Sequence, residues 1–169
     1  MDTLPDRVIN SRAPIRICDN GGWTDTWFAE YGRIFNIAVA PYAQVQIRVY
    51  PRAAHPDQVT IQAENFGDAY TFQPGVSDWG KQPLLEAAIT RLGVPKDISI
   101  EVALFSEAPP GGSTGTSAAI TVALIGALDA LTEDRLSPHE IAIMAQMVET
   151  QDQGLQCGGQ DQLCAAYGG

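Results

Sequence analysis

A glycine-rich segment constrains the fold of this chain more than any other feature. Residues 106–117 read SEAPPGGSTGTS and separate an alternating apolar stretch at 98–104 from a long run of small and apolar residues that begins at Ala118. Alternation indicates a strand, and an apolar run of that length indicates a buried helix. The free amides and the positive dipole end of such a helix would meet at the loop, so we expect an anion such as phosphate to bind there.

The loop has an ordinary reading as a surface turn, and two catalytic patterns compete with it. A Walker loop requires a lysine, and none lies in or beside the segment, which excludes that pattern. The hydrolase elbow G-x-S-x-G does match Gly111, Ser113 and Gly115. However, residues 108–110 separate the strand from the serine, and the only later histidine is His139, inside a helix-capping sequence. A serine hydrolase therefore remains a disfavoured alternative.

The rest of the chain predicts strands first and helices later. This order favours an α+β fold with a mostly antiparallel sheet packed on helices. The sequence S-P-H-E at 137–140 is a capping box with proline at the first helical position, and Gly93 followed by Pro95 would end an earlier helix. The expected strands are 13–18, 43–50, 58–63 and 98–104, with a short apolar run at 33–40, and the expected helices are 83–92, the one after the glycine loop, 137–151 and one within 157–169.

Composition limits the kind of partner. The 169 residues suit one domain or one lobe of a two-lobed protein, and 20 acidic against 10 basic residues give a net charge of −10. Such a charge argues against nucleic acid as a partner, although a small phosphorylated ligand stays open. No apolar stretch is long enough to cross a membrane, the first residues do not resemble a signal peptide, and three cysteines suggest free thiols. We therefore expect a soluble, cytoplasmic protein.

The glycine loop resembles the second motif of the GHMP kinases, the superfamily of galactokinase, homoserine, mevalonate and phosphomevalonate kinases. That motif is P-x-x-x-G-L-G-S-S-A-A, and the chain has PPGGSTGTSAA. Gly115, Ser117, Ala118 and Ala119 match the motif, with a proline ahead of them, and the departures are Ser113, Thr114 and Thr116. Ser113 brings a side chain to a position where the family keeps glycine.

Two further segments extend the resemblance over nearly the whole chain. Residues 12–36 contain A-P-x-R and then G-G-W-T-D at 21–25, which is similar to the first motif of heptose-phosphate kinases and fucokinases. Residues 149–169 contain G-x-Q-D-Q followed by A-A-Y-G-G, which most resembles heptose 7-phosphate kinases. The three segments occur in the order that the family has.

The resemblance implies the fold of a GHMP kinase N-terminal domain, which is similar to domain 2 of ribosomal protein S5. Residues 1–169 would form the ATP-binding domain, with the C-terminal lobe of the family absent from this chain. The implied activity is ATP-dependent phosphorylation of a sugar or sugar phosphate. The surface left by the absent lobe would favour association, including a homo-oligomer.

The resemblance also implies a role for each matching residue. Asp161 would accept the proton of the attacking hydroxyl, and Arg16 would hold that aspartate or the transferred phosphoryl group. Ser117 and Glu149 would bind Mg²⁺, since one carboxylate and a hydroxyl suit this cation together with substrate phosphates. ATP would contact Pro110, Gly111, Gly112, Ser113, Thr114, Gly115, Thr116 and Ser117. The sugar would contact Gly22, Thr24, Asp25, Gly159 and Gln160.

Several of these residues have a structural interpretation as well. Asp161 could cap a helix, Glu149 could lie on a solvated helix face, and Arg16, between two apolar neighbours on a strand, could point to solvent. Trp23 and Trp27 fit either stacking on a sugar or packing in the core. The functional alternatives are a fucokinase-like or galactokinase-like enzyme and a non-catalytic module that binds nucleotide or sugar.

Overall fold

A single five-stranded sheet forms the base of the molecule. The computed structural model describes residues 4–64, 67–75, 78–108, 112–132 and 135–168. The strand order is β1-β2-β5-β3-β4, and every neighbouring pair is antiparallel except β3 with β5. The mostly antiparallel α+β fold predicted from the sequence is confirmed. The strands are β1 Arg7–Asn20, β2 Phe35–Pro51, β3 Val59–Ala63, β4 Asp68–Phe72 and β5 Ile98–Ser106.

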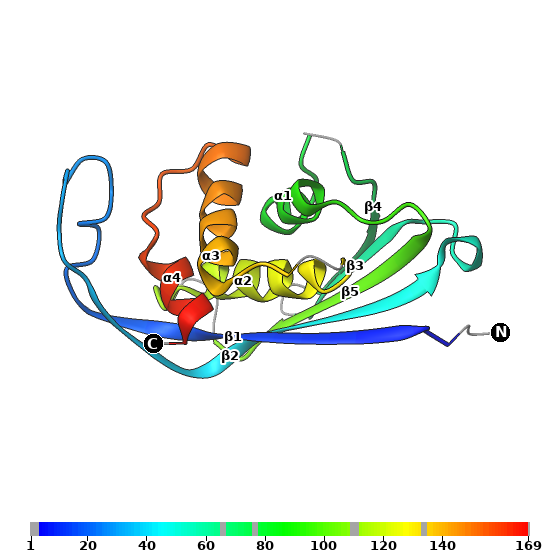
Figure 1. Cartoon of the computed structure of the whole chain (residues 1–169), viewed down its shortest axis with the longest axis horizontal. Coiled ribbons are helices and arrows are strands. Elements are labelled where there is room, and N and C mark those ends of the chain that lie inside the picture. Colours follow the sequence, from blue (N-terminus) through cyan, green and yellow to red (C-terminus); the bar gives the residue numbers. More distant parts are fainter. Residues whose placement is uncertain (1–3, 65–66, 76–77, 109–111, 133–134, 169) are drawn as a thin grey trace.

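The helices cover one face of this sheet (Figure 1). The central helix α2 packs on β1 and β2 and also contacts α1, α3 and α4. The α-helices are α1 Pro83–Leu92, α2 Thr116–Asp129, α3 Pro138–Met147 and α4 Gln160–Tyr167, and two shorter helical segments are the 3₁₀ turn η1 Arg52–Ala54 and the π-helical turn η3 Val148–Asp152. This arrangement places the start of α2 between the sheet and the other helices.

The sequence of α2 explains its central position. Its side chains are apolar on nearly all sides, as expected for a helix surrounded by protein. Leu124 and Ile125 are fully buried, and they share one core cluster with Ile47, Ile61 and Val102 from the sheet. Burial of such side chains supplies the main driving force for folding, at roughly 1.5–3 kcal/mol each. The glycine loop is therefore attached to a helix that is buried in the core of the domain.

Both helix-end signals are confirmed. Ser137 and Glu140 form a reciprocal capping box, with Pro138 at the first helical position of α3. Gly93 ends α1 with a positive φ of 76°, a backbone conformation that glycine adopts without strain.

Four elements differ from the sequence prediction. β1 spans Arg7–Asn20, whereas the expected strand covered only 13–18. β2 runs through Pro41 as one strand of 17 residues, with a register shift against β1 at Pro14/Ile15, so the 33–40 run and the 43–50 strand are continuous. β4 was not predicted, since only one of the five residues of this short edge strand is buried and its pattern is weak. The helix after Ser137 leaves α-helical geometry at Met147 and widens into η3.

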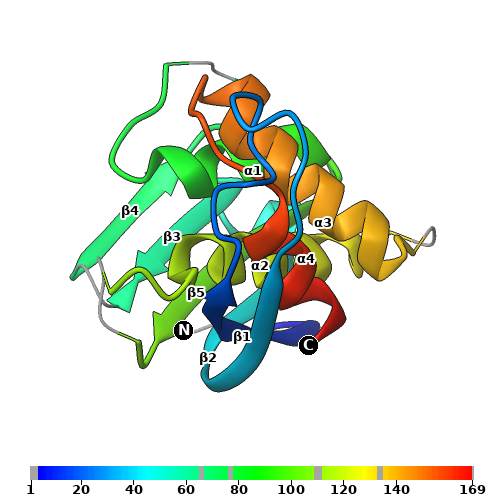
Figure 2. The ribbon, with the colours of Figure 1, turned by 90° about the vertical axis from the view of Figure 1, so that its left-hand side faces the viewer.

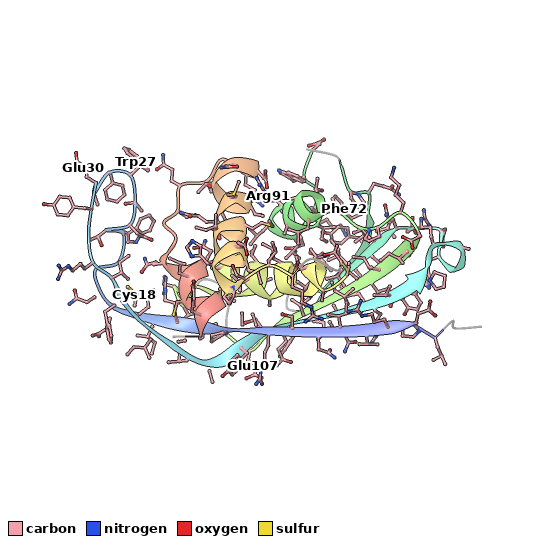
Figure 3. All side chains as sticks on the ribbon, in the orientation of Figure 1. Cys18, Trp27, Glu30, Phe72, Arg91 and Glu107 are labelled. Carbon is pink, nitrogen blue, oxygen red and sulfur yellow. The ribbon has the colours of Figure 1, made fainter. Side chains whose placement is uncertain are left out.

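The turn between β1 and β2 projects beyond the helices. It extends at one end of the molecule in Figure 1 and faces the viewer in Figure 2. Aromatic side chains on it are exposed, among them Trp27, which is labelled in Figure 3, and Tyr31. No helix in the described part of the chain is long and apolar enough to cross a membrane.

Candidate functional site

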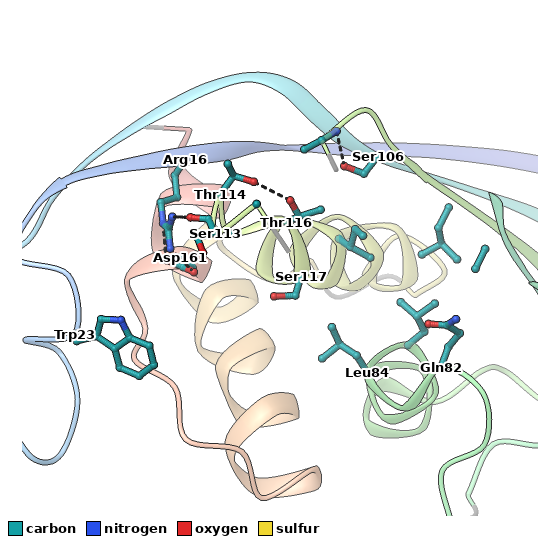
Figure 4. A pocket seen from close by; sticks show the side chains of 17 residues that line it. Arg16, Trp23, Gln82, Leu84, Ser106, Ser113, Thr114, Thr116, Ser117 and Asp161 are labelled. Carbon is teal, nitrogen blue, oxygen red and sulfur yellow. Dashed lines mark hydrogen bonds and ion pairs between the residues drawn. The ribbon is translucent and has the colours of Figure 1, made fainter. Parts of the chain in front are cut away.

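The glycine loop forms one wall of a cavity of about 460 Å³. Gly115 precedes α2 with a φ of 69°, and Ser113, although not a glycine, has a φ of 52°. The hydroxyls of Thr114 and Thr116 lie 3.0 Å apart (Figure 4). Of the predicted ATP contacts, Gly112, Ser113, Thr114, Gly115, Thr116 and Ser117 all line the cavity, and Pro110 and Gly111 fall outside the described residues. The strand–loop–helix unit thus opens into space that a ligand can enter.

Arg16 and Asp161 form a bidentate ion pair beside the glycine loop. Arg16 Nε donates to Asp161 Oδ1 at 2.7 Å and Nη2 donates to Oδ2 at 2.9 Å. Arg16 Nη1 also donates to the carbonyl of Ser113, and the backbone N–H of Arg16 donates to Thr114 O at 2.9 Å. Charge-assisted bidentate pairs combine strength with fixed geometry. One arginine therefore joins β1, the loop and α4.

The ion pair rules out the simpler interpretations of these two residues. The Arg16 side chain is only 13% exposed, so it does not point into solvent. The N-cap of α4 is Gly159, and Asp161 lies within the helix. Both side chains line the large cavity and a second, smaller one of about 120 Å³.

The turn after β1 reaches the same region from the other side. Asp25 Oδ2 accepts a hydrogen bond of 2.8 Å from the backbone N–H of Gln160, and both residues line the smaller cavity. Gly159 and Gln160 border a third cavity, behind this contact, together with Asp25. Thr24 and Gly22 line none of these cavities, since the Thr24 hydroxyl donates to Gly21 O within the turn and Gly22 lies against Cys18.

Ser117 and Glu149 both line the smaller cavity. Glu149 lies on the π-helical turn η3, and its Oε1 accepts a 2.8 Å hydrogen bond from Gln162 Nε2. Burial raises the pKa of the Glu149 carboxyl above its usual range, and the nearby Asp161 charge adds to the effect. The side chain therefore does not lie on a solvated face.

These residues fit Mg²⁺ as a ligand set. Gln162 is 2% exposed and lines the smaller cavity, and its Oε1 has no hydrogen-bond partner among the described residues. A hydroxyl, a carboxylate and an amide oxygen are the hard donors that Mg²⁺ takes. Within the described residues, no group of three His, Cys, Asp or Glu side chains is arranged to hold a metal ion by itself, so the cation would also need substrate phosphates and water.

The structure adds residues that the sequence analysis missed or left open. Gln162 was not singled out, although it follows the predicted base in G-x-Q-D-Q. Gln82 and Leu84, at the start of α1, line the far wall of the large cavity, and no local signal marked them. Trp23 lines both cavities and is 62% exposed, so the alternative of core packing is wrong.

The hydrolase alternative gains no support from this geometry. No histidine lines either cavity within the described residues, and His139 lies in the first turn of α3. Burial raises the pKa of Cys157 to about 12, so this thiol beside the site is not a nucleophile at neutral pH. A serine with no nearby base has no means of activation.

The described residues form an α+β domain in which a glycine-rich loop at the start of the central helix lies beside an arginine–aspartate pair. Helix starts of this kind favour anions, so the arrangement is typical of domains that bind a phosphorylated ligand. The family model "GHMP kinases N terminal domain" matches residues 83–169, half of the chain. The chain belongs to the GHMP kinase family, whose members use ATP as co-substrate, and the resemblance seen in its motifs is confirmed.

Individual relatives lie in several branches of the family. The chain is 25% identical to D-glycero-alpha-D-manno-heptose 7-phosphate kinase of Campylobacter jejuni, over 96% of this chain and 49% of the relative. It is 41% identical to mevalonate kinase of Pyrococcus abyssi, over 96% of this chain and 50% of the relative. The chain thus spans about half the length of these curated relatives.

Solved structures show the same fold. A D-glycero-D-manno-heptose 1-phosphate kinase from Bacteroides thetaiotaomicron superposes with a TM-score of 0.78 at 24% identity, over 96% of this chain and 54% of that one. Mevalonate kinase of Methanococcus jannaschii superposes with a TM-score of 0.77 at 18% identity, over 96% and 52%. At these identities the superpositions establish architecture and leave the substrate open.

Proposed function

We propose that this chain is the N-terminal, ATP-binding part of a kinase that phosphorylates a hydroxyl of a sugar or sugar phosphate, in the manner of heptose 7-phosphate kinases. The observation that carries the proposal is the contact of Arg16 with both Asp161 and the carbonyl of Ser113. This contact holds a carboxylate beside the loop that would bind phosphate. Similarity to the heptose 7-phosphate kinase and to a Bacteroides fragilis L-fucokinase supports a sugar as the acceptor.

The loop and α2 would bind the triphosphate. Gly112–Thr116 line the large cavity, where their backbone amides would contact the phosphates and the hydroxyls of Thr114 and Thr116 would add further donors. The cavity continues to Gln82 and Leu84 of α1, which would contact the base or ribose. Mg²⁺ held by Ser117 and Glu149 would neutralise charge on the phosphates.

Asp161 would act on the attacking hydroxyl. Arg16 binds both of its oxygens, so the carboxylate keeps one orientation and retains lone pairs that can accept the hydroxyl proton. Asp25, held by the Gln160 amide, would accept hydrogen bonds from other sugar hydroxyls. Such contacts discriminate against acceptors that lack a hydroxyl or have it inverted. The remaining wall of the substrate site would come from the part of the kinase that this chain does not span.

ADP release by the whole kinase tests this proposal. The acceptors are a heptose 7-phosphate, neutral hexoses, fucose and mevalonate, and a sugar or sugar phosphate should be the preferred one. Asp161→Asn should lower kcat by about 10³-fold and leave ATP binding intact, the scale of losing a positioned general base. Asp152→Asn is the matched control, because Asp152 is also paired with an arginine, Arg91, but lines neither cavity.

Each unfavourable outcome has a distinct meaning. Unchanged turnover in Asp161→Asn would remove the assigned base. Preference for mevalonate would keep the kinase and exclude the sugar. ATP binding with no turnover on any acceptor would favour the alternative of a non-catalytic binding module.

A further inference from the structure

Trp23 adopts a strained backbone conformation at the edge of the site. Its φ is 73°, in a region that bulky residues rarely adopt. Hydrogen bonds from the backbone and the hydroxyl of Thr26 to Trp23 O, and from Thr24 to Gly21 O, hold this turn. Strain of this kind costs about 1–3 kcal/mol and persists where the surrounding contacts enforce it, often at ligand sites.

This conformation presents the indole to the site. Trp23 lines the large cavity that contains the glycine loop and the small cavity that contains Asp25 and Glu149. Figure 4 shows the indole projecting from its turn on the side of the cavity where Arg16 and Asp161 lie. Phe28 stacks near it, with ring centroids 6.5 Å apart. Trp23 thus offers an exposed aromatic face within the site, whereas Trp27, in the same turn, lines neither cavity.

The charges around the small cavity limit what can lie on that face. Three carboxylates line it, those of Asp25, Glu149 and Asp161. Among the described residues that line the two cavities, the one cationic side chain is Arg16, and its guanidinium is already bonded to Asp161 and Ser113. An open-chain acid would place its own carboxylate in this acidic surrounding, where the described residues that line the two cavities offer no free cationic side chain to pair with it. A sugar ring offers hydroxyls to the carboxylates and an apolar C–H face to the indole.

We propose that Trp23 is the platform on which one face of the acceptor ring packs, so that the acceptor is a cyclic sugar, free or phosphorylated away from the reacting hydroxyl, and not an open-chain acid such as mevalonate. This inference rests on the proposed kinase function and narrows its substrate. Trp23 acts in sugar binding and specificity, and the phosphate loop and Asp161 act in transfer.

Three variants of the whole kinase test the proposal, with the best sugar acceptor of the panel. Trp23→Ala should raise KM for the sugar about tenfold, the upper range for one aromatic contact, with KM for ATP unchanged. Trp23→Phe should restore most of the affinity, because it keeps a flat ring. Trp27→Ala is the control, because Trp27 lies in the same turn and is 73% exposed. This variant should behave as the unmodified kinase.

A second measurement separates this inference from the proposed function. Sugar binding should change the tryptophan fluorescence of the unmodified kinase and of Trp27→Ala, and the change should be lost in Trp23→Ala. If no acceptor is phosphorylated but sugar changes the fluorescence of every form except Trp23→Ala, the kinase proposal fails and the role of Trp23 in sugar binding is supported. If sugars are phosphorylated and Trp23→Ala matches Trp27→Ala, the platform is wrong. A preference for mevalonate also overturns it.

Discussion

The two ends of the site are held by different kinds of contact. At the loop end, Arg16 joins residues 97 and 145 positions away in the chain through Ser113 and Asp161. At the other end, the turn after β1 is held largely by bonds over three residues, such as Thr24 to Gly21 and Thr26 to Trp23. Its long-range polar contact is Asp25 with the amide of Gln160. The loop end is thus fixed by the whole fold, and the turn is fixed mainly by its own sequence.

The proposed reaction has two parts, phosphoryl transfer at the loop end and acceptor recognition at the turn, and they differ in how exact a geometry they need. Phosphoryl transfer depends on positioning, and a displacement of about 1 Å can cost roughly a hundredfold in rate. Acceptor recognition tolerates variation, since one hydroxyl or ring contact changes affinity by a modest factor. A locally determined turn on a fixed scaffold lets the acceptor change while the transfer machinery stays in place.

Among the glycine variants, Gly115→Ala should disturb the loop end and give the largest effect on turnover. A methyl group at Gly115 would lie 3.2 Å from Arg16 Cγ and 3.4 Å from the Asp161 carboxyl, so the ion pair would shift. We expect kcat to fall about a hundredfold. The measurement is steady-state turnover with sugar and ATP, together with the free energy of unfolding in urea.

Gly154→Ala is the matched control for that variant. Gly154 has nearly the same φ, 66° against 69°, but a methyl group there meets nothing within 4 Å. Both variants should lose about 1 kcal/mol of stability from backbone strain, and only Gly115→Ala should lose turnover. Equal loss of turnover in both would show that the contact with Arg16 and Asp161 does not matter.

Gly158→Ala should disturb the other end with a smaller effect. A methyl group at Gly158 would overlap the Asp25 carboxylate, which lies against this glycine while it accepts the Gln160 amide. Displacement of Asp25 should raise KM for the sugar roughly tenfold, the scale of one lost hydrogen bond to a charged group, with KM for ATP unchanged.

Gly126→Ala in α2 serves as the comparison, since its methyl group would make only an ordinary contact, 3.4 Å from Ser11 Oγ. If Gly158→Ala instead raised KM for ATP, or lowered kcat as much as Gly115→Ala does, the two ends of the site would not act separately.

The sequence predicted those parts of the fold that depend on local patterns. The glycine loop, the helix it opens and the capping box at Ser137 follow from short-range backbone chemistry, and all are present. The run at 33–40 and the strand at 43–50 were predicted as separate segments, whereas a register shift against β1 at Pro14/Ile15 lets β2 continue through Pro41. The π turn at Val148–Asp152 has no local signature, since its extra residue is tolerated through packing of the surrounding helices.

The site was predictable only in part, for a related reason. Arg16 alternates with apolar neighbours on a strand, and that pattern alone places it in solvent. Its partner, Asp161, is 145 residues away, so only the resemblance to a family connected the two before the structure did. Gln162 and Trp23 owe their positions to tertiary packing and to a left-handed turn residue, and neither is visible in sequence periodicity.

Glu149→Gln tests what the loop end of the site contributes to stability, and its expected effect is small. Burial raises the pKa of Glu149, so the folded chain binds this proton more tightly than the unfolded chain does. Stability from this group is therefore present in acid and is lost as the pH rises above the ordinary glutamate range and through the raised pKa. Glutamine keeps the Oε1 acceptor for Gln162 and removes the charge. The variant should be more stable than the unmodified chain at neutral pH, and the difference should disappear in acid.

Urea midpoints from about pH 4 to about pH 8 measure this difference. Glu64→Gln, which removes the same charge at an exposed position after β3, is the matched control. A constant difference between Glu149→Gln and the unmodified chain across this range would mean that the carboxylate is solvated in the folded state. A gain at neutral pH accompanied by weaker binding of Mg·ATP would show that the loop end keeps a destabilising charge for its ligand. At the other end of the site, the destabilising contribution comes from the strained backbone of Trp23.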